Sequence, residues 1–328
     1  MNKVYLVNSD FLHTFVTIIK QLKQTETMKR LFSLMAICLF PLFAYSQLAG
    51  LPKGFETLDT TALRVFYDYN YPETFKMAKR LASVSVEDSI KQENSTDYMI
   101  LEIGTTGISK FYSDYKRRVD SLITEVMKNP QKAQFIMEEI QKSGIQKAEA
   151  GEIFKNYPAG KMTVTDNFNM INAFSYEDTL NDMDWTITSD TMTCLNYLCQ
   201  KAIADFRGRS YEAWFAPDIP VNDGPWKFSG LPGLILFAKD SENKYILKAV
   251  ALDNTKTPLQ FAKRDYMKIT RKELDKVKIR FAEDPIGSAL NAFPGADAKV
   301  LPNEFPDGKG GTISREDLKT TYNPMELE

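Results

Sequence analysis

The stretch GPWKFSGLPGLILFAKD, residues 224–240, places three glycines and two prolines beside large aromatic side chains and then continues as an unbroken apolar run. Pro232 restricts φ and Gly233 accepts a positive φ, so residues 231–234 predict a type II turn. The run 234–238 is apolar on both faces of a strand, which is typical of a central strand covered on both sides. The stretch therefore predicts a tight corner that leads into a buried strand.

The residues before this corner allow a structural and a functional interpretation. Asp223, Gly224 and Pro225 are typical of a turn, and we expect Trp226 and Phe228 to lie on one face of a short extended piece after it. In the structural interpretation, these aromatic side chains fill the core at a corner. In the functional interpretation, they line a ligand cleft and the glycines let a ligand approach the backbone closely.

Strand and helix patterns on either side of the corner predict the fold class. Strand-like segments separated by turn residues begin at residues 62–71 and 97–104 and continue through 161–253, which indicates an antiparallel sheet. Within residues 113–155, apolar residues recur at helical spacing. We therefore predict an α+β, β-rich fold: a curved antiparallel sheet with a helical insertion at about 113–155. The glycine- and proline-rich tail, 287–328, is expected to be largely irregular.

The N-terminal region predicts export. Residues 28–46 contain two basic residues, an apolar run and a small-residue cleavage site before Gln47, a pattern typical of a signal peptide. The apolar run is too short to span a membrane, so we expect no transmembrane anchor in the mature chain. We interpret residues 1–27 as a wrongly assigned start or an extension, and residues 47–286 as a single β-rich domain. The predicted localisation is beyond the inner membrane, in the periplasm, at the outer membrane or outside the cell.

The composition excludes several classes of site. The only histidine, His13, precedes the predicted mature start, so a Ser-His-Asp triad and the usual histidine-containing zinc or copper sites are excluded. The chain after residue 46 has 36 basic and 41 acidic side chains, which does not favour nucleic acid or an anionic membrane surface as a partner. The sequence contains no cofactor motif, and we expect neither a metal nor a cofactor.

Two cysteines remain in the mature chain, Cys194 and Cys199. On one extended strand, residues five apart point to opposite faces at about 16 Å. A bridge would need a tight reversal through residues 195–198, which contain no glycine. We therefore favour two buried small hydrophobic residues over a disulfide.

The opening stretch resembles the signature of the GLPGLI family of Bacteroidota cell-envelope proteins, because residues 230–235 read GLPGLI. Flanking pieces are similar too: YLCQKA at 197–202, FRGR at 206–209, AWF at 213–215 and YNPME at 322–326. The residues that match the family motif, for which a structural role is expected, are Cys199, Gly224, Pro225, Gly230, Leu231, Pro232, Gly233, Leu234 and Ile235.

The resemblance implies a secreted protein of unassigned function, often encoded near outer-membrane receptor genes. No catalytic residues are established for that family, so the resemblance assigns none to this chain. Cys194 and Asn196 depart from the family pattern, where an aliphatic residue and a glycine are usual. The partner that it implies is an outer-membrane receptor or another envelope protein.

Arg207 and Arg209 flank Gly208, so on an extended chain their guanidinium groups would face one side. They could clamp an anion or a carboxylate, for which the guanidinium fork is suited. They could equally form salt bridges with neighbours such as Asp205 or Glu212.

Two functional classes follow from these residues. The expected one is non-catalytic binding of an apolar or amphipathic ligand, or of an envelope partner, with contact area from Trp185, Trp214, Trp226 and Phe228. The alternative is a histidine-free hydrolase that uses Asp or Glu with Arg. A wide apolar concavity lined by the three tryptophans would favour binding, and buried carboxylates that converge beside the arginines would favour chemistry. We expect substitution of Trp214 and Arg209 to weaken binding and leave the fold intact.

Overall fold

The computed structural model describes residues 52–72, 94–129, 151–167, 172–180, 182–284, 287–288, 303–306, 312–316, 319, 322 and 324–327. The predicted signal peptide lies outside these ranges. The chain divides into two compact units, one made of residues 49–279 and 320–328 and the other of residues 1–48 and 280–319.

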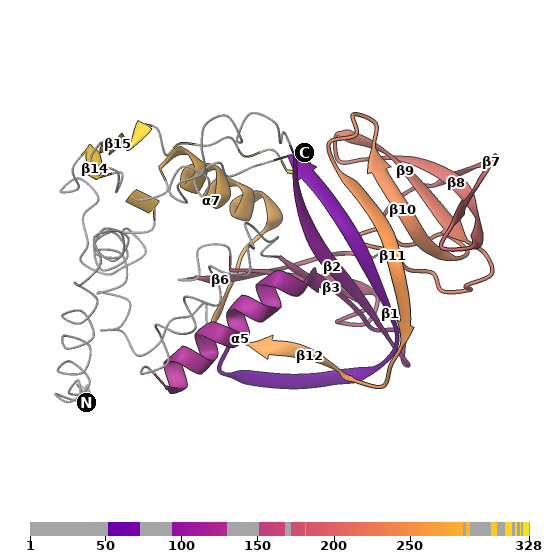
Figure 1. Cartoon of the computed structure of the whole chain (residues 1–328), viewed down its shortest axis with the longest axis horizontal. Coiled ribbons are helices and arrows are strands. Elements are labelled where there is room, and N and C mark those ends of the chain that lie inside the picture. Colours follow the sequence, from indigo (N-terminus) through magenta and orange to yellow (C-terminus); the bar gives the residue numbers. More distant parts are fainter. Residues whose placement is uncertain are drawn as a thin grey trace. The chain divides into compact units, whose positions relative to one another are not determined.

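The first unit is built on one 13-stranded sheet (Figure 1). Its strands are β1 Gly54–Pro72, β2 Asn94–Gly104, β3 Ser109–Ser113, β4 Glu152–Lys155, β5 Lys161–Asp166, β6 Ala173–Thr179, β7 Thr186–Cys194, β8 Tyr197–Phe206, β9 Arg209–Ala216, β10 Leu234–Asp240, β11 Ile246–Asn254, β12 Pro258–Lys263 and β13 Tyr266–Lys268. In space their order is β13-β6-β5-β4-β3-β2-β1-β11-β10-β9-β8-β7, and β12 pairs with β1 outside this path. The strand pairs are antiparallel except β6 and β13, which are parallel. The predicted β-rich fold with an antiparallel sheet is confirmed, with this one parallel pair added.

The sheet curves because β1 pairs with different strands along its length. Residues 54–60 pair with β12, whereas residues 61–72 pair with β2 and, for most of that length, with β11. Register shifts near Asp59 and Leu63 mark the change of partner, and irregularities of this kind bend a strand. Figure 1 shows β1 as the long curved strand that carries the change of direction.

The carboxylate of Asp59 fastens this bend to the turn between β2 and β3. It accepts hydrogen bonds from the N–H of Thr60 at 2.6 Å and the hydroxyl of Thr105 at 2.8 Å, and from the N–H and hydroxyl of Thr106 at 2.8 and 2.6 Å. Desolvation opposes ionisation, but these hydrogen bonds outweigh it and lower the pKa of Asp59 to about 2. The ionised carboxylate is therefore part of the corner.

Strand β10 lies inside the sheet between β9 and β11. Leu234, Ile235 and Leu236 are each 0% exposed, so the strand covered on both sides that the apolar run predicts is confirmed. The hydroxyl of Tyr67, itself buried in β1, donates to the C=O of Ile235 at 2.7 Å. The core of the first unit therefore centres on the strand that the opening stretch leads into.

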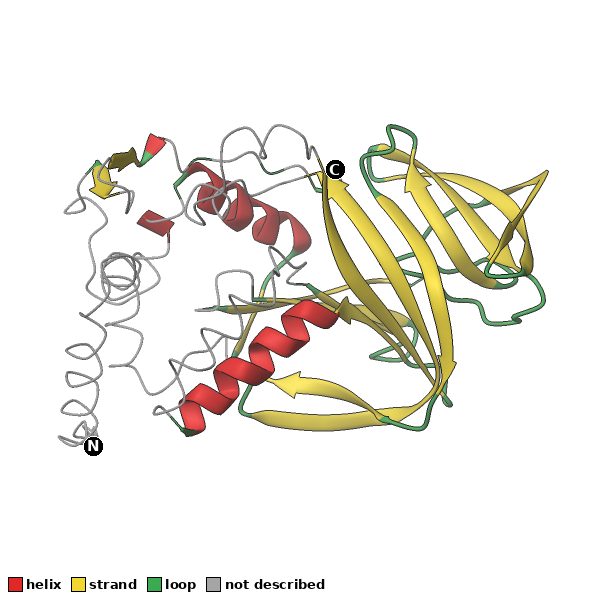
Figure 2. Ribbon diagram, in the orientation of Figure 1, coloured by secondary structure: helices red, strands yellow, loops and turns green. Residues whose placement is uncertain are grey.

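The helical insertion begins where the sequence indicates (Figure 2). Helix α5, Asp114–Lys128, is capped by Ser113, whose hydroxyl accepts the N–H of Lys116 at 3.1 Å. Residues 130–150 of the predicted helical region, 113–155, lie outside the described residues. Its last part, Glu152–Lys155, forms strand β4, so the expectation of a helix there is wrong.

The described part of the C-terminal region contains regular structure. Helix α7, Arg271–Glu283, follows β13. In the second unit, β14, Glu304–Pro306, pairs with β15, Thr312–Ser314, as a short hairpin. Within the described ranges, neither helix has the length and apolar composition needed to cross a membrane.

Candidate functional site

The corner at residues 231–233 has a different geometry from the predicted type II turn. The N–H of Gly233 donates to the C=O of Leu231 at 2.9 Å, which closes a three-residue turn around Pro232. Gly233 does not adopt a positive φ, whereas Gly230 does, at 96°. A Cβ at Gly233 would lie 2.4 Å from the C=O oxygen of Ala216. Glycine is needed here for close approach of two backbones, and the expectation of a positive φ is wrong.

Trp226 lies in a turn, so the expectation of a short extended piece is also wrong. The N–H of Phe228 donates to the C=O of Pro225 at 3.1 Å, and Trp226 adopts a φ of 51°. The buried ammonium of Lys155 holds this turn through bonds to the carboxylate of Asp223 at 2.6 Å and the C=O of Phe228 at 2.8 Å. A bulky residue at positive φ is strained and must be held by its surroundings.

Arg207 and Gly208 form the tight turn of the β8–β9 hairpin, with φ values of 45° and 79°. Two consecutive positive φ values are typical of a type I′ turn. The interpretation that placed Arg207 and Arg209 on one face of an extended strand is therefore wrong. Their salt-bridge partners also differ from the neighbours suggested by the sequence: Arg207 pairs with Asp178, and Arg209 pairs with Asp240.

Four charged side chains meet beside this turn, and we call them the ionic cluster: Asp178, Arg207, Lys227 and Glu326. Asp178 accepts two hydrogen bonds from Arg207, at 2.6 and 2.8 Å, and one from Lys227 at 2.7 Å. The ammonium of Lys227 also donates to both carboxylate oxygens of Glu326, at 2.8 and 2.9 Å. The side chain of Lys227 is 2% exposed, so its charge is balanced almost entirely by these carboxylates.

Electrostatics keep Asp178 and Lys227 charged. Burial alone would raise the pKa of Asp178, but the bonds and charges of Arg207 and Lys227 hold it far below its usual range. Burial alone would lower the pKa of Lys227, but Tyr176 and the carboxylates of Glu326 and Asp178 raise it. Asp178 is therefore an ionised hydrogen-bond acceptor and not a proton donor at neutral pH.

The fourth member, Glu326, belongs to the C-terminal segment, Pro324–Leu327, which lies along the start of β9. Arg209 donates from Nε and Nη2 to the C=O of Pro324 at 3.2 and 3.1 Å. The hydroxyl of Tyr211 donates to the C=O of Met325, and the N–H of Leu327 donates to the C=O of Arg207 at 2.9 Å. Met325 is 9% exposed.

An aromatic cluster lies next to the ionic cluster. The rings of Trp226 and Phe228 are 5.0 Å apart, and that of Tyr211 lies 5.7 Å from Trp226 and 5.2 Å from Phe228. Trp185 joins at 5.9 Å from Phe228, and its indole N–H donates to the C=O of Ser229 at 2.8 Å. The structure thus brings together Trp185, Trp226 and Phe228.

Trp214 does not join this group. It lies three residues after Tyr211 in β9, so the two side chains point to opposite faces of the sheet. Its neighbours across the ladder are Lys201 and Phe237, and the ammonium of Lys201 lies 5.8 Å from its ring centre. A cleft shared by the three tryptophans is therefore excluded.

The cysteines lie on two strands of a hairpin. Cys194 ends β7, Cys199 lies in β8, and Leu195 and Asn196 turn the chain between them with φ values of 48° and 67°. The expectation of one extended strand with thiols on opposite faces is wrong, because the hairpin pairs Cys194 with Tyr197 and Met192 with Cys199, which places both thiols on one face. The thiol of Cys199 donates to the C=O of Tyr197 at 3.6 Å. The interaction between the two neighbouring thiols lowers the pKa of Cys194 and raises the pKa of Cys199. Both are free thiols; Cys199 is buried and Cys194 is partly exposed.

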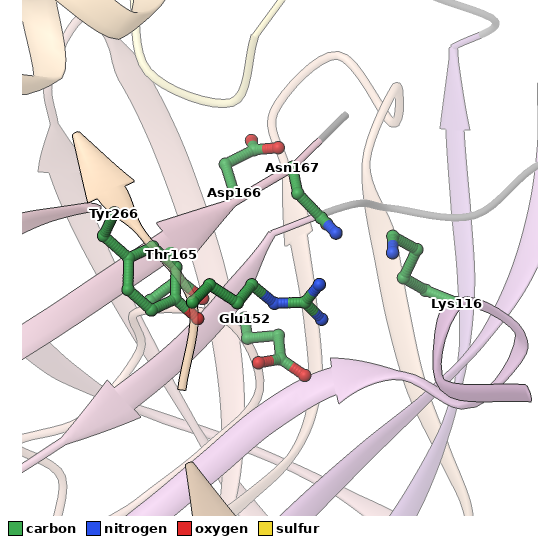
Figure 3. Close-up of a pocket in the computed structure, with 7 residues that line it drawn as sticks. Lys116, Glu152, Thr165, Asp166, Asn167 and Tyr266 are labelled. Atoms are coloured by element: carbon green, nitrogen blue, oxygen red, sulfur yellow. The ribbon is translucent and has the colours of Figure 1, made fainter. Parts of the chain in front are cut away.

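A small polar pocket, with room for about one water molecule, lies elsewhere in the first unit. In Figure 3, Lys116 comes from α5, Glu152 from β4 and Tyr266 from β13. Thr165 and Asp166 come from β5, and Asn167 follows it. Its lining residues are Lys116, Glu152, Thr165, Asp166, Asn167, Arg264 and Tyr266. Glu152 pairs with Lys110 at 3.0 Å and Asp166 pairs with Lys278, so these carboxylates are already neutralised by protein cations. Over the described ranges, no group of three or more His, Cys, Asp or Glu side chains is placed to hold a metal.

Comparisons with known proteins give a family match over a short region. Residues 206–237 match a family described as "Protein of unknown function (Porph_ging)". This match runs from the end of β8 to β10 and includes Arg207, Arg209, Trp214, Trp226, Lys227 and Phe228. No curated protein matches the sequence.

Two solved structures of PNGF-II, in P21 and C2 space groups, are similar to 66% of the chain, at 11% and 12% identity and TM-scores of 0.42 and 0.43. The matched region spans 32% of the PNGF-II chain in each case. A similarity of this size carries no information on function.

Sequence reasoning missed three of the four members of the ionic cluster. Lys227 sits inside the opening stretch but was passed over between two aromatic residues, and Asp178 has no neighbour in sequence that marks it. The signal for Glu326 was present, because YNPME at 322–326 is one of the pieces that resemble the GLPGLI family.

Proposed function

We propose that this protein is a non-catalytic binding protein of the cell envelope that belongs to the GLPGLI family, is exported by the signal peptide at residues 28–46, and holds an acidic segment of an envelope partner. The observation that supports binding is the way in which Arg207 and Lys227 hold the carboxylate of Glu326 beside the aromatic cluster. The guanidinium fork and a buried ammonium are suited to a carboxylate. The partner is an outer-membrane receptor or another envelope protein.

The cluster favours binding over the hydrolase alternative. A hydrolase that uses two carboxyl groups needs one of them protonated near neutral pH to act as an acid. Asp178 has the opposite property, since Arg207 and Lys227 keep its pKa far below the usual range. Carboxylates do converge beside an arginine here, but they are fixed as ion-pair partners of protein cations.

A pull-down from envelope extract tests the proposal. Immobilised mature protein, residues 47–328, is compared with Arg207→Gln and with the control Arg118→Gln, which changes an exposed arginine of α5. We expect an envelope protein to be enriched by the wild type and the control and lost with Arg207→Gln. If nothing is enriched and the protein instead hydrolyses a peptide, ester or glycan in a way that depends on one Asp or Glu, the enzyme alternative replaces this proposal.

The predicted export is tested separately. Mass spectrometry of the native protein should give a chain that begins at or near Gln47. A chain that retains residues 28–46 would contradict it.

A further inference from the structure

The C-terminal segment contacts the first unit in the way that a bound peptide contacts its receptor. Its main chain is held at three of its four residues, through the C=O groups of Pro324 and Met325 and the N–H of Leu327. One side chain, Met325, enters the core, and the next, Glu326, enters the ionic cluster. Peptide-recognition sites commonly combine main-chain hydrogen bonds, which give affinity, with pockets for alternate side chains, which give specificity.

The segment reaches this site on a long connection. Residues 280–319 separate it from the rest of the first unit and form the second unit together with residues 1–48. The segment is therefore tethered to its site and is not a direct continuation of the sheet.

The charges of the site select an acidic ligand. When Glu326 is removed, Lys227 keeps only Asp178 as a carboxylate partner, and it shares Asp178 with Arg207, whose other partner is the half-exposed Asp182 at 3.5 Å. The side chains of Lys227 and Asp178 are only 2% and 10% exposed, and an uncompensated charge at such a depth is costly. A ligand that brings a carboxylate to the position of Glu326 restores the balance.

We propose that the surface beside the Arg207–Gly208 turn and the start of β9 is a binding site for an extended peptide in which a buried apolar residue is followed by an acidic residue. The chain's own segment Pro324–Leu327 is its resident occupant, and an acidic segment of the partner displaces it. The identity of that partner rests on the proposed binding function; the peptide site itself does not. A tethered occupant acts at a high effective concentration, so the apparent Kd of a competing segment equals its intrinsic Kd divided by the fraction of time for which the site is empty.

The test uses the full mature chain with a protease recognition sequence inserted in the glycine-rich stretch 308–311. After cleavage, we expect the C-terminal fragment to co-elute with the rest of the protein on gel filtration. A labelled peptide of residues 320–328, TTYNPMELE, should then exchange into the site, and fluorescence anisotropy measures its binding. Binding of the same peptide to the uncut chain should be at least about tenfold weaker, because the tethered segment competes.

Two matched variants distinguish recognition from packing. The peptide with Glu326→Gln should bind the cleaved chain at least about tenfold more weakly, since it loses charge-assisted hydrogen bonds. The cleaved chain with Arg207→Gln should lose affinity for the normal peptide by a similar factor, and Arg118→Gln should not. Circular dichroism of the cleaved chain with and without peptide reports on folding.

Three outcomes would overturn the inference. They are equal binding of the normal and Gln peptides, a fragment that never exchanges with added peptide, and a cleaved chain that unfolds and is not restored by the peptide. These outcomes do not depend on the envelope pull-down. Peptide binding without a captured partner leaves the site in place and removes only the proposed function.

Discussion

At the scale of single residues, close approach decides the opening stretch more than conformational preference does. Gly233 is needed because a Cβ there would lie 2.4 Å from the C=O oxygen of Ala216. Gly224 is needed because a Cβ there would lie 2.8 Å from the Cβ atom of Ile235. The turn-like sequence indicates that glycine is required at these positions, but it does not show which contact requires it. A type II turn and a backbone crossing both call for glycine, and only the fold brings residue 216 to residue 233.

Gly233→Ala should destabilise the protein by about 1–3 kcal/mol, because the added methyl group collides with backbone that cannot move aside as a flexible side chain can. Urea unfolding of the wild type and the variant measures the difference. Ser241→Ala, an exposed position after β10, is the control and should leave the midpoint unchanged. An unchanged midpoint for Gly233→Ala would contradict the close approach.

Asp59→Asn should destabilise the bend of β1 by about 1–3 kcal/mol, since an amide cannot replace a carboxylate that accepts four hydrogen bonds. The pKa of Asp59 is about 2 in the folded state, below its ordinary value of 3.8. Its contribution is therefore fully present above about pH 4 and is lost as pH falls through about 2.

Unfolding measured between pH 5 and about pH 2 checks this dependence on Asp59. The loss of stability on acidification should be smaller in Asp59→Asn than in the wild type. Asp190→Asn, whose side chain is 60% exposed, is the control. Parallel pH curves for the wild type and Asp59→Asn would show that the carboxylate does not hold the bend.

At the scale of elements, the sequence predicts strands better than it predicts the turns that divide them. The run from Cys194 to Phe206 reads as continuous strand, yet Leu195 and Asn196 split it into β7 and β8. Neither glycine nor proline marks this turn, and its one local signal is Asn196, a residue type that tolerates a positive φ. The buried strand β10 was predictable because a short run that is apolar on both faces is typical of a strand covered on both sides.

Asn196→Gly should stabilise the β7–β8 hairpin by up to about 0.5 kcal/mol, since glycine adopts the observed φ of 67° with less strain than asparagine. Chemical denaturation measures the gain. Thr191→Gly introduces glycine within β7 and should destabilise the protein, because glycine lowers the stability of a strand. A loss of stability in both variants would argue against a positive φ at residue 196.

At the scale of the whole molecule, the sheet could be predicted from local patterns, but the candidate site could not. Strand signals and a capped helix gave the fold class. The ionic cluster joins Lys227 to a carboxylate 99 residues away, and Arg207 to the same residue across 119 positions. Each of these residues reads in sequence as an ordinary charged side chain, since charge alone carries no information about a distant partner.

The domain boundary at residue 286 stays a prediction, and the C-terminal segment provides its test. A chain that ends at residue 286 loses Met325, whose burial is worth about 1.5–3 kcal/mol, and leaves Lys227 without one of its two carboxylate partners. A chain in which a Gly/Ser linker of equal length replaces residues 289–319 keeps both Met325 and the carboxylate of Glu326. We expect the linker variant to unfold at the temperature of the intact first unit, and the shortened chain to unfold at a clearly lower temperature.

Calorimetry of the three proteins, each beginning at Gln47, measures these transitions. The linker variant separates loss of the second unit from loss of the C-terminal segment, because only the second unit is altered in it. Added peptide 320–328 should raise the transition temperature of the shortened chain in proportion to the logarithm of its concentration, as for any ligand that binds the folded state. If the shortened chain is as stable as the intact one, or the linker variant is as unstable as the shortened one, the first unit does not depend on residues 320–328 in the way its contacts indicate.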